Sequence, residues 1–334
     1  MKKKEYSLAH LTAISTTPLE LAKIAANCGY DYVSIRQIYM GVAGEVPVDL
    51  SEDKKAYQEM KDLFKDTGLK LLDIELARIY DGVDLESYKR AFDTGKSLGA
   101  KHVLSSIWTD NKEYGIEKFA ELCDLAKKYD LTVELEAVPI AGVKSFAEVA
   151  EILRIIKRDN AGLMMDTHHF NRANDSVELL RTFPSEWFRY AQICDAPLAP
   201  LERDKMIEIM RGGRDYLGEG LIDVASILNA MPIVPYSIEL PNSKKVEEYG
   251  YEGHAKKCLE TAKKYDFNEE EKEEFEYFFK NEKNKFFIAK AIEDKISVNE
   301  NDVTKLYTEN KANFDAQNIP FSEAREIIQR DLLN

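Results

Sequence analysis

The strongest constraint in this sequence is a regular alternation of short apolar stretches with longer amphipathic ones, from the N-terminus to about residue 265. The amphipathic stretches carry apolar residues at three- and four-residue spacing, which is typical of helices with one buried face. The short stretches have the length and the apolar content of strands that are buried on both faces. The strand candidates lie at 6–10, 32–36, 70–75, 102–107, 132–138, 161–166, 188–194 and 235–240.

Eight strand–helix units predict an α/β fold with a parallel sheet. Eight units in about 260 residues suit a closed (β/α)8 TIM barrel. The alternative is an open doubly wound sheet, but no GxGxxG sequence follows any of these strands. Local signals agree with the helices: the sequence from Thr17 to Glu20 has the pattern of a capping box, and Gly29, Gly68 and Gly99 stand where helices would end.

The last 70 or so residues have a different character, because they are charged, helical in pattern and free of strand-like alternation. We therefore predict two domains, a TIM barrel at 1–265 and a charged helical C-terminal extension at 266–334. The extension would pack on the barrel, join subunits into a homo-oligomer, or bind a different partner.

Charge and composition narrow the classes of function. The chain has 334 residues and a formal net charge of −14, which argues against binding to nucleic acid because phosphate contacts need clustered Lys and Arg. No apolar stretch reaches the length of a membrane span. The four cysteines, Cys28, Cys123, Cys194 and Cys258, are scattered and predict reduced thiols in a cytoplasmic protein.

Oxygen-bearing side chains end four consecutive strand candidates, and a TIM barrel places its chemistry at these ends. Three carboxylates brought together repel each other and lose hydration, so a cation must neutralise them. Oxygen ligands suit Mg²⁺, Mn²⁺ or Co²⁺ best, with Zn²⁺ as a further candidate. We expect His169 beside this site, facing the substrate. The predicted metal ligands are Glu136, Asp166, Gln192 and Glu239.

Further polar or aromatic residues near strand ends are candidates for substrate binding. An arginine presents a planar pair of donors that suits a carboxylate or a phosphate, and Trp108 would form an apolar wall for a sugar ring. For each of them the alternative is a structural role as a helix cap, an ion pair or a packed side chain. The candidates are His10, Arg36, Glu75, Arg78, Trp108 and Arg214.

The chain resembles the sugar phosphate isomerase/epimerase family, the xylose-isomerase-like TIM barrels, over residues 5 to about 265. The resemblance rests on several short segments taken together. These are "SLAHLT", "GYDYVSIR", "LLDIELARI", "VELEAVPIAGV", "GLMMDTHHF", "RYAQICDAP", "LGEG" and "SIELPN".

The resemblance places the family's metal ligands on the same four strand-end residues. Many members have His where Gln192 stands. Gln occurs in a subset that includes bacterial 3-dehydroshikimate dehydratases, which also carry the matches of His169 and Arg214. Those dehydratases follow the ligand that matches Glu136 with an Arg-His pair, whereas this chain has "AVPIAGVKS". The resemblance therefore favours an isomerase over a dehydratase.

The implied activity is a metal-dependent isomerase or epimerase of a sugar, keto-sugar or sugar phosphate, with proton abstraction next to a carbonyl and an enediolate intermediate. In related epimerases two metal-bound glutamates transfer the proton, and the matching residues are Glu136 and Glu239. His169 is a further acid–base candidate. The alternatives are a dehydratase of the 3-dehydroshikimate or inosose type, and a non-catalytic barrel with a partner-binding tail. The expected ligand is a small carbohydrate or keto acid.

Overall fold

Eight parallel strands close into a barrel in the order of the sequence, so the predicted (β/α)8 fold is confirmed. The structure is a computed structural model that describes residues 4–197, 202–265 and 300–316, together with Pro320, Phe321, Ala324, Arg325 and Ile328. All eight predicted strands are present. They are β1 (Tyr6–Ala9), β2 (Tyr32–Arg36), β3 (Lys70–Ile79), β4 (His102–Ile107), β5 (Thr132–Glu136), β6 (Ala161–Asp166), β7 (Ala191–Ile193) and β8 (Tyr236–Ile238).

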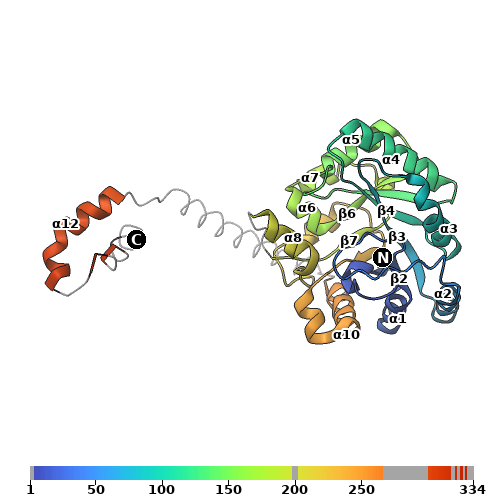
Figure 1. The fold of residues 1–334 in the computed structure, drawn as a ribbon, viewed down its shortest axis with the longest axis horizontal. Coiled ribbons are helices and arrows are strands. Elements are labelled where there is room, and N and C mark those ends of the chain that lie inside the picture. The colour runs from blue at the N-terminus through green and yellow to red at the C-terminus, as the bar shows by residue number, and fades with distance from the viewer. Residues whose placement is uncertain are drawn as a thin grey trace. The chain divides into compact units, whose positions relative to one another are not determined.

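Helices connect the strands and lie around the outside of the barrel (Figure 1). The α-helices of this part are α1 (Pro18–Cys28), α2 (Lys54–Thr67), α3 (Lys89–Ser97), α4 (Lys112–Lys127), α5 (Phe146–Ile156), α6 (Thr167–Ala173), α7 (Val177–Leu180), α8 (Arg203–Gly212), α9 (Val224–Asn229) and α10 (Ser243–Lys264). Short 3₁₀ turns occur at η1 (His10–Ala13), η2 (Leu85–Tyr88) and η3 (Ser185–Trp187). None of the described helices is long and apolar enough to cross a membrane.

The helix boundaries follow from local chemistry. Thr17 and Glu20 form the predicted capping box, in which each side chain accepts a hydrogen bond from the backbone N–H of the other residue. Gly29 and Gly68 end α1 and α2 in the left-handed conformation, which glycine adopts without steric strain. Helices such as α1, α3, α4 and α5 pack on the strands with buried residues, whereas α8 has no buried residue.

The interior of the barrel is layered. Side chains two residues apart on a regular strand share a face. β3 departs from this rule, because its pairing shifts register and both Glu75 and Leu76 line the interior. A middle layer is apolar and formed by Leu72, Leu76, Leu104, Met164 and Tyr190. This layer separates the polar residues at the carboxyl ends of the strands from a second polar group near their amino ends.

The chain divides into two compact units, Met1–Phe267 and Asn268–Asn334. In the second unit the described helix is α12 (Glu300–Ala316), where Tyr307 stacks on Phe314 with ring centroids 5.7 Å apart. The other helices predicted for the extension lie outside the described residues. The predicted domain boundary at residue 265 and the role of the extension remain predictions.

Candidate metal centre

Four consecutive strands bring the predicted metal ligands to one rim of the barrel. Glu136 and Asp166 are the last residues of β5 and β6, and Gln192 lies in the middle of β7. Asp166 and Gln192 are direct neighbours in the strand pairing. Glu239 follows β8, and its N–H donates to the Ile193 carbonyl at 3.2 Å, which continues the ladder by one residue. All four side chains are therefore directed into the same end of the barrel, as the strand-end argument predicts.

The tightest group of potential ligand atoms belongs to Glu136, Asp166 and His169, all buried, whose nearest such atoms lie within 4.8 Å of one another. His169 Nε2 is 3.6 Å from Glu136 Oε1. Asp166 also caps α6, because its Oδ1 accepts the His169 N–H at 2.9 Å. This cap fixes the first turn of α6 and brings the imidazole over the carboxylates. The sequence predicted His169 beside the metal site, and in the structure its imidazole lies next to two of the predicted ligands. Its role there remains a prediction.

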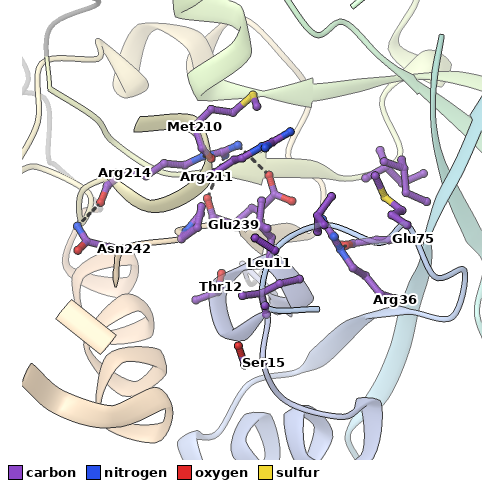
Figure 2. Close-up of a pocket in the computed structure, with 18 of the residues that line it drawn as sticks. Leu11, Thr12, Ser15, Arg36, Glu75, Met210, Arg211, Arg214, Glu239 and Asn242 are labelled. Carbon is purple, nitrogen blue, oxygen red and sulfur yellow. Dashed lines mark hydrogen bonds and ion pairs between the residues drawn. The ribbon is translucent and has the colours of Figure 1, made fainter. Parts of the chain in front are cut away.

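Arg214 lies within the centre itself. From the sequence we predicted that Arg214 binds the substrate. In the structure Arg214 is only 1% exposed, and its guanidinium bridges two acids. Its Nη1 lies 2.8 Å from Asp166 Oδ2. Its Nη2 lies 3.1 Å from Glu239 Oε2, and Figure 2 shows Arg214 beside Glu239 and Asn242. Nη1 also donates to the Glu239 carbonyl at 3.1 Å, and Asn242 donates to the Arg214 carbonyl at 2.7 Å. Arg214 therefore fixes the orientation of two of the acids.

The amide of Gln192 has one nitrogen in use and one free oxygen. Nε2 donates to Glu239 Oε1 at 3.2 Å. Oε1 is buried and has no hydrogen-bond partner among the described residues. A buried acceptor without a partner is energetically costly, and an amide oxygen is a suitable ligand for a hard divalent cation. This orphaned oxygen fits a metal at the position where the carboxylates converge.

The charges of the centre also fit a divalent cation. Glu136, Asp166 and Glu239 are all buried, and the Arg214 guanidinium neutralises one of the three carboxylates. Two negative charges remain, and a buried unpaired charge is strongly unfavourable. One divalent ion would balance the negative charge of the described residues that converge here.

The protonation tendencies reflect this excess of acid. Burial, followed by the neighbouring acids Glu239 and Asp166, raises the pKa of Glu136 well above its ordinary value. Burial raises the pKa of Glu239 to about 8, although Arg214 opposes the shift. At Asp166 burial acts in the same direction, but Arg214 and the capped first turn of α6 outweigh it and hold the pKa below its ordinary value. Burial lowers the pKa of His169 to about 4, so its imidazole is neutral at pH 7.

A cavity of about 660 Å³ opens above the centre, within the size range of small-molecule binding sites. Its wall includes Glu136, His169, Arg214 and Glu239. Four of the remaining predicted substrate-binding residues also line it, namely Arg36, Glu75, Arg78 and Trp108. Burial raises the pKa of Glu75 to about 8, with the nearby Asp73 as the next cause.

His10 is different. Its Nδ1 accepts the Arg36 N–H at 2.8 Å, and its Nε2 lies 2.9 Å from the Thr16 carbonyl. Both ring nitrogens are therefore bonded to the backbone, and neither is free for a substrate. The prediction of His10 as a substrate-binding residue is corrected to a structural role, in which it joins the end of β2 to the loop after η1.

Two residues of the site were not identified from the sequence. Glu45 lies in the loop after β2, accepts the N–H groups of Met40 and Val42, and places Oε1 3.8 Å from Arg36 Nη1. Asp195 follows β7, and its carboxylate accepts the N–H groups of Gly218 and Ile222, which ties down the loop after Arg214. Neither lies in a recognisable motif. A buried acid that organises a loop becomes evident only once the partners of the loop backbone are known.

Curated relatives of this chain are enzymes. The inosose isomerase of Bacillus subtilis strain 168 is 25% identical over 266 residues, a match that covers 76% of this chain and 93% of that protein. The 3-dehydroshikimate dehydratase of Pseudomonas aeruginosa is 25% identical over 258 residues, covering 73% of this chain and 38% of that protein.

Solved structures share the fold. The IolI protein, solved with a bound zinc atom, gives a TM-score of 0.65 at 22% identity and covers 77% of this chain and 96% of its own. The D-allulose 3-epimerase of Methylomonas sp., solved with D-allulose, gives a TM-score of 0.57 at 19% identity, with coverages of 79% and 98%. The family profile described as "xylose isomerase-like TIM barrel" matches residues 22–262. The resemblance seen in the sequence is thus confirmed, and the chain belongs to the xylose isomerase-like TIM barrel family.

Proposed function

We propose that this protein is a divalent-metal-dependent isomerase or epimerase that moves a proton next to the carbonyl group of a keto-sugar or a related sugar. The observation that carries the proposal is a cluster of two buried carboxylates and an imidazole, those of Glu136, Asp166 and His169, beside an open cavity. A third buried carboxylate, that of Glu239, is bonded to Gln192, whose amide oxygen has no partner among the described residues. The identity of about 25% to inosose isomerases supports the same class of reaction.

Glu136, Asp166, Gln192 and Glu239 would hold the ion, with His169 as a further candidate ligand. Mn²⁺, Mg²⁺ and Co²⁺ suit this oxygen-rich set best, while the imidazole also admits Zn²⁺. The ion supplies a Lewis acid that stabilises the negative charge which develops on the substrate oxygens during proton abstraction.

Two glutamates are placed to accept and return the proton. Glu136 comes from β5 and Glu239 from the end of β8, with β6 and β7 between them in the barrel. Both line the cavity, so each can approach the substrate from a different side. Removal of the proton from one face by one glutamate, and delivery of a proton to the opposite face of the same carbon by the other, would invert a stereocentre. Delivery of the proton to the neighbouring carbon, with a hydroxyl proton moving between the two oxygens, would convert a ketose into an aldose.

The surrounding residues position these groups. Arg214 fixes the Glu239 carboxylate through Nη2 and the Glu239 backbone through Nη1. His169 would hydrogen-bond a substrate hydroxyl or act as a second acid–base group. Arg36, Glu75, Arg78 and Trp108 would bind the remainder of the substrate from the cavity wall.

A dehydratase is the second candidate, because it begins with the same proton abstraction and then expels a hydroxyl group. The similarity to a 3-dehydroshikimate dehydratase and the Gln at position 192 favour it. The segment after β5 disfavours it, because Val138 and its neighbours stand where the dehydratases carry an Arg-His pair.

We further propose that the protein is cytoplasmic and that the C-terminal helices join copies of the chain.

The test is exchange of the substrate proton with solvent. The metal-loaded protein would be incubated in D₂O with inosose, D-fructose, D-allulose and 3-dehydroshikimate in turn, and NMR would follow deuterium at the carbon next to the carbonyl. Exchange with formation of an isomer supports the proposal, whereas loss of water, which turns 3-dehydroshikimate into an aromatic acid and inosose into an unsaturated ketone, supports the dehydratase. The Glu136→Gln variant is the control that should abolish exchange. No exchange with any of these compounds, at full metal content, would count against both.

A further inference from the structure

A second cavity lies directly beside the one above the metal centre. Its volume is about 500 Å³, and it shares three wall residues, Met40, Leu76 and Arg78, with the first cavity. The rest of its wall comes from the loop after β2 and from the segment that follows β3 and runs to η2 and α3. The two cavities therefore adjoin and have one wall in common, which brings a ligand in the second cavity close to the first.

Exposed aromatic rings line this second cavity. Tyr39 is 57% exposed and Tyr80 is 48% exposed, which makes them two of the most exposed large side chains with apolar surface in the described chain. A tyrosine ring has an apolar face and a polar tip, and it contacts ligands at a low cost in conformational entropy. Two such rings at a polar hollow are suited to the apolar faces of a sugar ring, whose hydroxyls then face the polar wall.

Gln37 gives an independent indication of a ligand. Its side chain lines the second cavity and is only 5% exposed. The Nε2 atom donates to Asp49 Oδ1 at 2.9 Å, while Oε1 is buried and lacks a hydrogen-bond partner in the described part of the chain. A buried amide oxygen without a donor is unfavourable unless a ligand hydroxyl or a water supplies one.

The charges of the cavity favour a neutral ligand over a phosphate. Arg90 Nη2 donates to Asp49 at 2.7 Å and to Ser51 and Glu52 at 2.8 Å, so this guanidinium is already satisfied by protein groups. The acids Asp49 and Glu52 offset the charges of Arg90 and Arg78. A wall with balanced charges, exposed tyrosines and an unpaired acceptor matches a polyhydroxylated ring.

We propose that this second cavity, walled by Tyr39, Tyr80 and Gln37, is a sugar-binding site, and that the substrate is a glycoside whose second ring occupies it. The sugar-binding site is independent of the reaction, whereas the placement of the first ring above the metal centre rests on the proposed function. The substrate is then larger than the single rings named for the relatives.

Binding of simple methyl glycosides tests the site alone. Saturation-transfer NMR would be recorded with methyl α-D-glucopyranoside, methyl β-D-galactopyranoside and methyl β-D-xylopyranoside, none of which has a free carbonyl. At least one should bind the wild type, and the Tyr39→Ala/Tyr80→Ala variant should lose the signal. Tyr249→Ala is the matched control, because Tyr249 is 37% exposed on α10 and lines neither cavity. Binding by none of the three, or equal binding to the double variant, would overturn the proposal.

Ketose disaccharides test the link between the cavities. Calorimetry with the metal-loaded protein would compare D-fructose with isomaltulose and lactulose, which keep the ketose and add a second ring at different positions. We expect at least one disaccharide to bind about tenfold more tightly than fructose, and the double tyrosine variant to remove that gain while fructose affinity stays constant. Equal affinity for fructose and both disaccharides would overturn the extended substrate.

The two proposals fail in different ways. In the Asp166→Asn variant the metal centre is disabled, but the second cavity is unchanged, so methyl glycoside binding should persist. If this variant loses its metal and its proton exchange but still binds methyl glycosides, only the metal centre has been affected. Exchange of D-fructose protons without any glycoside binding would support the proposed function and overturn the second site.

Discussion

The two ends of the barrel interior both contain buried acids, but they differ in access and in the balance of charge. At the carboxyl ends of the strands Glu136, Asp166 and Glu239 line or adjoin an open cavity. Near the amino ends Glu134 is 0% exposed, accepts Thr132 Oγ1 at 2.7 Å and lies 3.2 Å from Arg189 Nη1. His102, at the start of β4, stacks on Tyr190 and bonds to Thr132.

The difference shows that a buried acid on a strand does not by itself mark a reactive site. Arg189 reaches Glu134 across Gly162, where a Cβ would lie only 2.2 Å from Nη1, so the lower group is closed by a protein cation. The upper group keeps an excess of negative charge, whereas Arg189 offsets the charge of Glu134 in the lower group. A buried oxygen without a hydrogen-bond partner among the described residues occurs in both groups, at Gln192 Oε1 and at Glu134 Oε2. Open access and uncompensated negative charge together distinguish the proposed metal centre from the structural cluster.

The sharpest contrast comes from neutralising one acid at each end. Glu239→Gln should lower the rate of substrate proton exchange by about 10³-fold, because a general base is removed. Glu134→Gln, the matched change at the lower end, should leave the rate within about threefold of wild type. Both rates would be measured by deuterium incorporation. Equal losses in the two variants would show that burial, and not position in the cavity, determines the effect.

The two arginines that pair with buried acids, Arg214 and Arg189, should differ in their link to the metal. Arg214→Met leaves Asp166 and Glu239 without their cation, and breaking such a buried pair costs about 3–5 kcal/mol of unfolding free energy. Added divalent metal should restore part of this loss, because it would neutralise the same carboxylates.

Arg189→Met serves as the control, since it should also destabilise the protein but gain nothing further from metal. Denaturant unfolding with and without Mn²⁺ would measure both variants. If metal rescues Arg189→Met as strongly as Arg214→Met, the two clusters are not distinct.

A methyl group at position 162 should affect the lower end alone. In Gly162→Ala the Cβ would approach Arg189 Nη1 to 2.2 Å and the Trp187 carbonyl oxygen to 2.8 Å, so either the side chain or the backbone must move. We expect a loss of about 1–3 kcal/mol in unfolding free energy from overpacking. Metal content, measured on the same sample, should equal that of wild type. If the variant folds normally but lacks metal, the lower end of the barrel influences metal binding at the upper end.

The last prediction concerns pH. Burial, opposed by the nearby Ser34 and Tyr190, raises the pKa of Asp73 to about 7. The unfolded state has the lower pKa, so Asp73 favours the folded state most at low pH, and this contribution declines as the pH rises towards 7. Asp73→Asn should therefore gain about 2–3 kcal/mol relative to wild type between pH 5 and pH 8, at ~1.4 kcal/mol per pH unit up to the folded-state pKa. Thermal melts across this range would show it, and a constant difference would refute it.

The sequence was sufficient to predict the barrel, because the period of each element and the number of units leave few alternatives. It also predicted Glu136, Asp166, Gln192 and Glu239 at one rim, since the ends of parallel strands meet there. It could not predict that Arg214 lies between two of these acids, or that both nitrogens of His10 are bonded to backbone. These contacts depend on the conformations of the loops after β1 and β7, and loop sequences carry no periodic pattern from which a conformation can be predicted. The second cavity was missed for the same reason, because Tyr39 and Tyr80 lie on irregular segments.

The central claim is that the upper group of acids binds a metal ion, and metal content tests it most directly. Elemental mass spectrometry would compare the wild type, Asp166→Asn and the lower-end control Glu134→Gln. Asp166→Asn keeps the side-chain shape and an oxygen for the α6 cap but removes the charge. We predict about one divalent ion per chain in the wild type and in Glu134→Gln, and a large loss in Asp166→Asn. No ion in the wild type after incubation with Mn²⁺, Mg²⁺, Co²⁺ or Zn²⁺, or equal content in all three proteins, would contradict the claim.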